Sequence, residues 1–114
     1  MSIPLDLTFR DMEPSEAVTT TIRNALDRLG KIYDRIQRCV VVVERPHQSQ
    51  RHGQGFHVRL QIVVPDKVIT IGRDPAHDDE HMNVFTAIGD AFRVARRQLQ
   101  DHAEIIRGDV KSHA

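Results

Sequence analysis

The chain has 114 residues and a mass of 13.0 kDa, which is the size of a single domain. Its 39% hydrophobic and 28% charged residues are typical of a folded domain and exclude a disordered or fibrous chain. The 16 basic and 16 acidic residues give a formal net charge of zero, so bulk charge favours neither a nucleic-acid nor a membrane partner.

A strand and a helix are the first predicted elements. Residues 3–9 alternate between apolar and polar side chains, as a half-buried strand does, and Pro4 favours an edge position because proline cannot donate a ladder hydrogen bond. Ser15 is the predicted helix N-cap, and Glu16 suits the positive end of the helix dipole. A helix of about five turns follows. Its apolar stripe consists of Val18, Ile22, Ala25, Leu26, Leu29, Ile32 and Tyr33.

Three strands are predicted in the middle of the chain. Residues 36–45 are rich in β-branched side chains, and residues 56–64 alternate apolar with polar side chains. The polar segment 46–55 predicts a long hairpin loop. Pro65 and Asp66 form a tight-turn sequence, so residues 67–73 should return as an antiparallel strand.

A second helix completes the predicted fold. An acidic, histidine-rich loop over residues 76–81 leads into an apolar stripe at helical spacing: Val84, Ile88, Ala91, Phe92, Ala95 and Leu99. The pattern fades after Glu104, which predicts one domain over residues 1–104 and a flexible C-terminal tail over 105–114. The order β-α-β-β-β-α predicts an α+β two-layer sandwich, with both helices on one face of a largely antiparallel four-stranded sheet.

The apolar segments are too short for a membrane span. Val40 to Val43 is the longest such run, and the first ten residues lack the basic and apolar regions of a signal peptide. A single cysteine, Cys39, begins this apolar stretch directly before Val40 and is expected to be a small buried hydrophobe. We therefore expect a cytoplasmic protein with no membrane partner.

Basic side chains on the two helices form the first candidate nucleic-acid interface. A protein that binds the RNA backbone needs cations on one surface, because neutralised phosphates release counterions and supply most sequence-independent affinity. Asn24, Arg28, Lys31 and Arg35 are spaced four, three and four apart, which aligns them along one flank of the first helix. The candidate RNA-binding residues are Arg23, Arg28, Lys31, Arg35, Arg93, Arg96 and Arg97. The alternative is a solvated charged face, most of all for Arg93, because Asp90, Asp101 and Glu104 share its helix and can form ion pairs there.

A second candidate surface lies on the sheet. Residues 35–73 contain seven basic and two acidic residues, which makes the middle of the chain locally basic. Its candidate contacts are Arg38, Arg45, Arg51, Arg59 and His57, on the outward side of two strands and in the hairpin loop. The alternative is an ordinary exposed sheet face whose charges discourage aggregation.

The seven histidines carry a weaker metal hypothesis. His77 and His81 flank three acidic residues, and His47, His52 and His57 recur at intervals of five. Zinc needs three or four converging ligands, yet neither Cys-x-x-Cys nor His-Glu-x-x-His is present. The sequence also lacks a phosphate-binding glycine loop and an apparent nucleophile arrangement. We therefore predict no metal, no cofactor, no small-molecule substrate and no enzymatic activity. A metal-dependent enzyme remains as a third hypothesis, behind the two functions considered below.

Two stretches of sequence resemble one family. Residues 15–17, Leu29 and the run Tyr33-Asp34-Arg35-Ile36 resemble the first helix, and its exit into the second strand, of the ribosome hibernation promoting factors. These are also called ribosome-associated inhibitor A or sigma-54 modulation proteins. Phe85-Thr86-Ala87-Ile88 and Arg97-Gln98-Leu99 resemble the family's second helix. The sequence departs from that pattern at Gly89, and at Asp101, Ala103 and Glu104, where relatives are lysine-rich.

The resemblance implies a function and a fold. The fold it implies is like that of a double-stranded-RNA-binding domain. The partner it implies is the small ribosomal subunit with its ribosomal RNA, bound near the decoding centre, so that translation stops under stress. Arg28, Arg35 and Arg97 match basic positions of the family pattern. The alternative is a protein-interaction module of the same fold that has lost ribosome binding.

Overall fold

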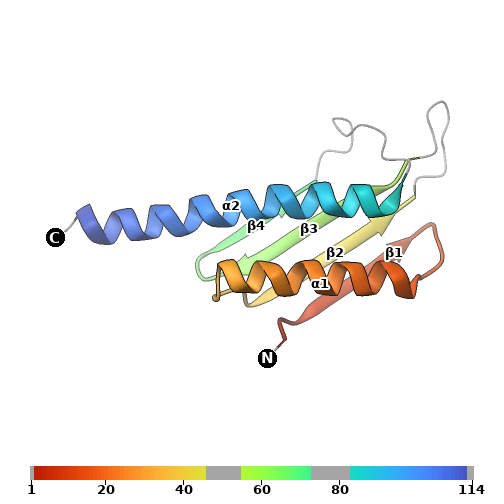
Figure 1. Cartoon of the computed structure of the whole chain (residues 1–114), viewed down its shortest axis with the longest axis horizontal. Coiled ribbons are helices and arrows are strands. Elements are labelled where there is room, and N and C mark those ends of the chain that lie inside the picture. The colour runs from red at the N-terminus through yellow and green to blue at the C-terminus, as the bar shows by residue number, and fades with distance from the viewer. Residues whose placement is uncertain (1, 46–54, 73–82, 113–114) are drawn as a thin grey trace.

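The computed structural model describes residues 2–45, 55–72 and 83–112. Its elements, in chain order, are β1 (Leu5–Arg10), α1 (Glu16–Ile32), β2 (Arg38–Glu44), β3 (His57–Val64), β4 (Lys67–Ile71) and α2 (Val84–Ser112). The strands form one four-stranded sheet in the order β1-β2-β3-β4, and both helices cover the same face of it (Figure 1). The predicted element order and two-layer architecture are therefore confirmed.

The sheet is mixed in direction. β1 pairs with β2 in parallel, and α1 forms the crossover between them, whereas β2–β3 and β3–β4 are antiparallel. Leu7 lies opposite Val41, and Val41 lies opposite Leu60, so apolar side chains align in rows beneath the helices. β1 occupies one edge of the sheet, as predicted, and β4 occupies the other. Pro4 precedes β1 and its backbone faces β2, so its missing N–H is not at the free edge.

Local sequence signals set the ends of α1. The Ser15 side chain accepts a hydrogen bond from the backbone N–H of Val18 at 3.2 Å, which confirms the predicted N-cap. At the other end, the backbone N–H of Tyr33 donates to the Leu29 carbonyl at 3.0 Å before the chain turns toward β2. This orients the apolar stripe of α1 toward the sheet along its full length.

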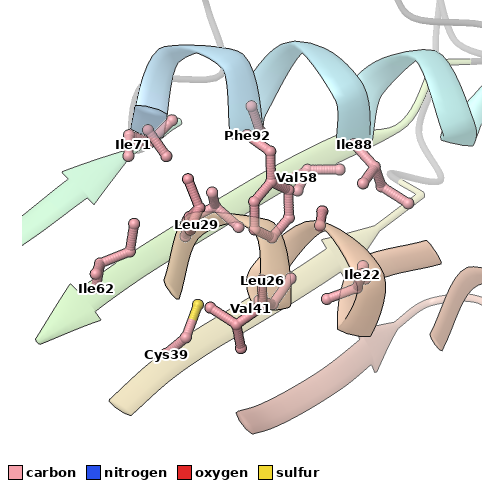
Figure 2. Close-up of a cluster of buried hydrophobic side chains, with 14 of the residues drawn as sticks. Ile22, Leu26, Leu29, Cys39, Val41, Val58, Ile62, Ile71, Ile88 and Phe92 are labelled. Carbon is pink, nitrogen blue, oxygen red and sulfur yellow. The ribbon is translucent and has the colours of Figure 1, made fainter. Parts of the chain in front are cut away.

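The core lies between the helices and the sheet. Figure 2 shows Ile22, Leu26 and Leu29 of α1 beside Ile88 and Phe92 of α2, above the side chains of the strands. The largest side chains with almost no exposure are Ile22, Leu26, Leu60, Ile62, Ile88 and Leu99. A continuous apolar layer of this kind supplies most of the stability of a domain of this size.

A tight turn and a glycine determine the course of β4. Pro65 and Asp66 form the turn between β3 and β4, with Asp66 in the left-handed region at φ 69°. Gly72 follows β4 at φ 78°, and a Cβ atom there would lie 2.3 Å from the Val58 carbonyl oxygen. Only glycine fits this position, so β4 ends at Ile71, two residues before the predicted end.

The predicted end of the second helix near Glu104 is wrong. α2 continues to Ser112 and has 29 residues, so residues 105–112 are helical. Charged residues interrupt the apolar stripe in this region. The helix continues because each residue added to a formed helix gains one backbone hydrogen bond without a new nucleation cost. The division into a domain over 1–104 and a flexible tail stays a prediction. The last turns of α2 project beyond the sheet in Figure 1. Neither described helix carries an apolar stretch that could cross a membrane.

Cys39 is fully buried in β2, and we expect its thiol to be inert in the folded protein. Burial raises the pKa of the Cys39 thiol to about 12, an effect that the nearby Arg23 guanidinium partly opposes. The reactive thiolate is therefore rarer by roughly a thousandfold than for an ordinary cysteine near pH 8. A disulfide reagent should react with native protein at least that much more slowly than with urea-unfolded protein. Similar rates in both states would show that Cys39 is accessible.

Candidate nucleic-acid interface

Five unpaired cations lie on the outer side of the helical layer. α1 and α2 run in the same direction, side by side, with their apolar sides toward the sheet (Figure 1). Exposed basic side chains occupy the opposite sides and the end of α1: Arg28, Lys31, Arg35, Arg96 and Arg97. Within the described part of the chain, none of the five forms an ion pair. Their charges are therefore free to interact with an anionic partner.

Two of these arginines border the groove between the helices. Arg28 follows the first residue of α1 by twelve positions, and Arg96 follows the first residue of α2 by twelve. Because the helices start near each other and run parallel, both arginines lie about 18 Å along their helices. Ile32 and Ala103 line one cleft between the helices. Arg28 is one turn before Ile32, and Arg96 is two turns before Ala103. Arg28 and Arg96 therefore belong to the two helices that border this groove, each a short way before the cleft.

That cleft lies where α2 passes the end of α1. It has a volume of about 400 Å³ and is lined by Lys31, Ile32, Tyr33, Asp34, Arg35, Ala103 and Ile106. The His102 ring meets the Tyr33 ring edge-on, with centroids 5.7 Å apart, and no described residue bonds to its buried Nε2. Sequence reasoning missed this cleft because it ended the helix at Glu104. The signal was the helical spacing of Leu99, Ala103 and Ile106.

Arg23 and Arg93 differ from the other predicted RNA-binding residues. Arg23 is half-buried, donates to the Ile3 carbonyl at 2.8 Å, and has its Nη1 3.8 Å from Asp27 Oδ1. It precedes Arg28 by five residues and so points about 140° away from it, toward β1. The guanidinium of Arg93 lies 2.9 Å from the Asp90 carboxylate, which partly offsets its charge, as the alternative interpretation for this residue expected. An exposed pair of this kind is worth only about 0.2–1 kcal/mol, so an anionic partner could still displace it.

Two residues of the second candidate surface have partners, two others are partly or fully buried, and one lies outside the described residues. Arg38 donates from Nε to the Asp6 carboxylate at 2.9 Å, and the Arg45 guanidinium lies over the Phe56 ring, 5.5 Å from its centroid. His57 faces away from the helices, as predicted, but it is 6% exposed and so buried. Arg59 is half-buried with an Nε that has no partner among the described residues. Arg51 lies outside the described residues, and the remaining side chains do not form a free cationic face.

The histidine clusters of the metal hypothesis lie largely outside the described residues. His47 and His52 belong to segment 46–54, and His77 and His81 belong to segment 73–82. Among the residues that the structure describes, no group of three or more histidine, cysteine or acidic side chains is arranged to hold a metal ion. The prediction that the protein binds no metal stays a prediction.

Solved structures with the same fold cover nearly the whole chain. The crystal structure of the Thermus thermophilus Protein Y N-terminal domain matches with a TM-score of 0.69 at 19% identity, covering 90% of this chain and 99% of that one. A ribosomal subunit interface protein from Coxiella burnetii matches with a TM-score of 0.73 at 13% identity, over the same shares of the two chains. At such identities the similarity establishes the fold alone.

Sequence comparison identifies the family. No curated protein matches the chain by sequence. A family model does, and it covers residues 5–107, which include all six described elements except the last five residues of α2 and contain the five unpaired cations. The chain therefore belongs to the family described as sigma-54 modulation protein / S30EA ribosomal protein.

Proposed function

We propose that this protein is a non-enzymatic translation inhibitor that binds the small ribosomal subunit near the decoding centre under stress. Family membership and the fold shared with a ribosomal subunit interface protein support a ribosomal partner. On this proposal the protein contacts ribosomal RNA, occupies space that messenger and transfer RNA need, and uses no cofactor. Its site of action would be the cytoplasm.

The single observation that carries the proposal is the set of five unpaired cations on the helical layer. Arg28 and Lys31 belong to α1 and Arg35 follows its end, whereas Arg96 and Arg97 belong to α2. Lys31 and Arg35 line the cleft between the two helices. Because its formal net charge is zero, the protein cannot attract RNA through its overall charge. A local patch is sufficient, because only charges within about 10 Å of a phosphate interact strongly at physiological salt.

A salt series of co-sedimentation with ribosomes tests the proposal. We expect the protein to pellet with isolated small subunits at low salt and much less with large subunits. If all five cations contact phosphates, the logarithm of the affinity should fall with the logarithm of salt concentration with a slope of about 4. Prior loading of the small subunit with messenger and transfer RNA should reduce binding.

The outcomes separate the proposal from its alternative. Binding that is equal on both subunits, or that transfer RNA leaves unchanged, would contradict the placement near the decoding centre. Absence of binding at low salt by a folded protein would favour a protein-interaction module that has lost ribosome binding. Circular dichroism of the same sample would verify that the protein is folded.

A further inference from the structure

The β1 edge of the sheet carries backbone hydrogen-bonding groups to which no described residue bonds. The Pro4 carbonyl accepts from the Cys39 N–H, and the Arg10 carbonyl accepts from the Arg45 N–H, so even-numbered residues of this segment face β2. In a parallel ladder alternate residues point their N–H and C=O groups the other way. Leu5, Leu7 and Phe9 therefore direct theirs to the free edge. Pro4 faces β2 and does not block that edge.

An apolar groove runs beside this edge, between β1 and α1. Its volume is about 770 Å³, and it is lined by Leu5, Leu7, Phe9, Pro14, Thr19, Thr20 and Arg23. The three apolar side chains of β1 pack only partly against the core. A strand added at the edge would place its own side chains over this groove, because it would continue the same face of the sheet.

The charges of β1 are complementary to those of a second, antiparallel β1. Asp6 and Arg10 are exposed on the sheet face away from the helices, and each is two residues from Thr8. If a two-fold axis passes beside Thr8, Asp6 lies directly opposite Arg10 of the other copy, and Leu7 lies opposite Phe9. Leu7 and Phe9 then form the hydrogen-bonded pairs, and Asp6 and Arg10 form the closer pairs without backbone bonds, where side chains approach best.

The neighbouring strand extends this pattern. Asp6 already receives a hydrogen bond from Arg38 of β2, and Arg10 lies opposite Glu44 of β2. Across the joined sheets the order of charges is Arg38, Asp6, then Arg10 and Glu44 of the second copy. Each charge therefore has neighbours of opposite sign, and the two-fold axis repeats the row on the other side of Thr8.

We propose that two copies of this chain associate through their β1 edges, antiparallel and centred on Thr8, to form one continuous sheet. The partner's edge closes the groove in each copy by placing Phe9 against Leu7. A closed two-fold contact of this kind joins two copies and leaves no β1 edge for a third. The unpaired helix cations lie away from β1, so the proposal stands whether or not the protein binds ribosomes.

Analytical ultracentrifugation of charge variants tests the pairing register. Arg10→Asp places two carboxylates on the edge, and Asp6→Arg places two guanidinium groups there. Each variant alone should remain monomeric between about 10 μM and 1 mM, where the wild-type chain shows increasing dimer by mass action. An equimolar mixture of the two variants should dimerise, because every acidic residue then faces a basic one. Lys67→Asp at the opposite, β4, edge changes the net charge as Arg10→Asp does and should dimerise like wild type.

Several results would overturn this inference. A wild-type chain that stays monomeric at about 1 mM would exclude a second copy as the occupant and leave the edge to an extended peptide of another protein. A dimer that persists in both single variants, or that Lys67→Asp abolishes, would place the interface elsewhere. Failure of the mixture to dimerise, with both variants folded by circular dichroism, would exclude the register centred on Thr8.

Discussion

Replacing Arg28, Lys31 and Arg35 together with alanine should reduce ribosome affinity by about 10²-fold or more near 0.1 M salt. The salt dependence should also become less steep, by about 0.7–0.9 in slope for each lost phosphate contact. The fold should survive, because the three side chains are exposed and no described residue pairs with them. The measurement is binding to isolated small subunits at several salt concentrations.

A matched control removes the same charge from the sheet. Arg38, Arg45 and Arg59 changed together to alanine also delete three cations, but from the second candidate surface. This variant should keep most of its affinity, because Arg38 is paired with Asp6 and Arg45 is stacked on Phe56. If the sheet variant loses binding and the helix variant keeps it, the RNA-binding surface is on the sheet.

The Leu99→Ala substitution should destabilise the protein by about 2–5 kcal/mol. Leu99 has no exposed surface in α2, so the change removes apolar contacts and leaves a cavity that the surroundings fill only partly. A domain of this size has a free energy of unfolding of about 5–15 kcal/mol, so the loss is a large fraction of it. The midpoint of thermal unfolding should fall by about 10 °C or more. Urea unfolding of both proteins measures the difference directly.

Ile105 provides the control on the same helix. It is 60% exposed, so Ile105→Ala should change the free energy of unfolding by no more than about 0.5 kcal/mol. Equal effects at the two positions would mean that α2 packs on the sheet through a different side. They would also place the cations of α2 on the wrong face for the proposed interface.

Local patterns were sufficient to predict the elements. Ser15, Pro65 and Asp66 each act through backbone groups within a few residues of themselves, so their effects can be predicted from short segments. The alternation in β3 and the apolar stripe of α1 similarly report which side faces the core. The end of α2 at Ser112 was harder to predict: the spacing of Leu99, Ala103 and Ile106 extends the apolar stripe only to Ile106, and the helix then continues on backbone hydrogen bonds.

Contacts between distant segments could not be predicted in the same way. Arg38 and Asp6 are 32 positions apart and meet only because β1 and β2 pair in one particular register. The sequence therefore predicted Arg38 as a free cation, whereas the structure pairs it. Conversely, Arg28 and Arg96 were predicted on separate helices, and it is the parallel packing of α1 and α2 that places both beside one groove.

The parallel pairing of β1 with β2 delays the folding of this chain during its own synthesis. β1 leaves the ribosome first, but its partner for Arg10 is Glu44, which is added 34 positions later. Because synthesis adds about 5–20 residues per second, the strand that carries Leu5, Leu7 and Phe9 stays unpaired for several seconds. α1 can form meanwhile and cover them, whereas β2, β3 and β4 pair with neighbours as soon as each emerges. β1 is therefore the strand of this sheet that remains longest without its partner during synthesis.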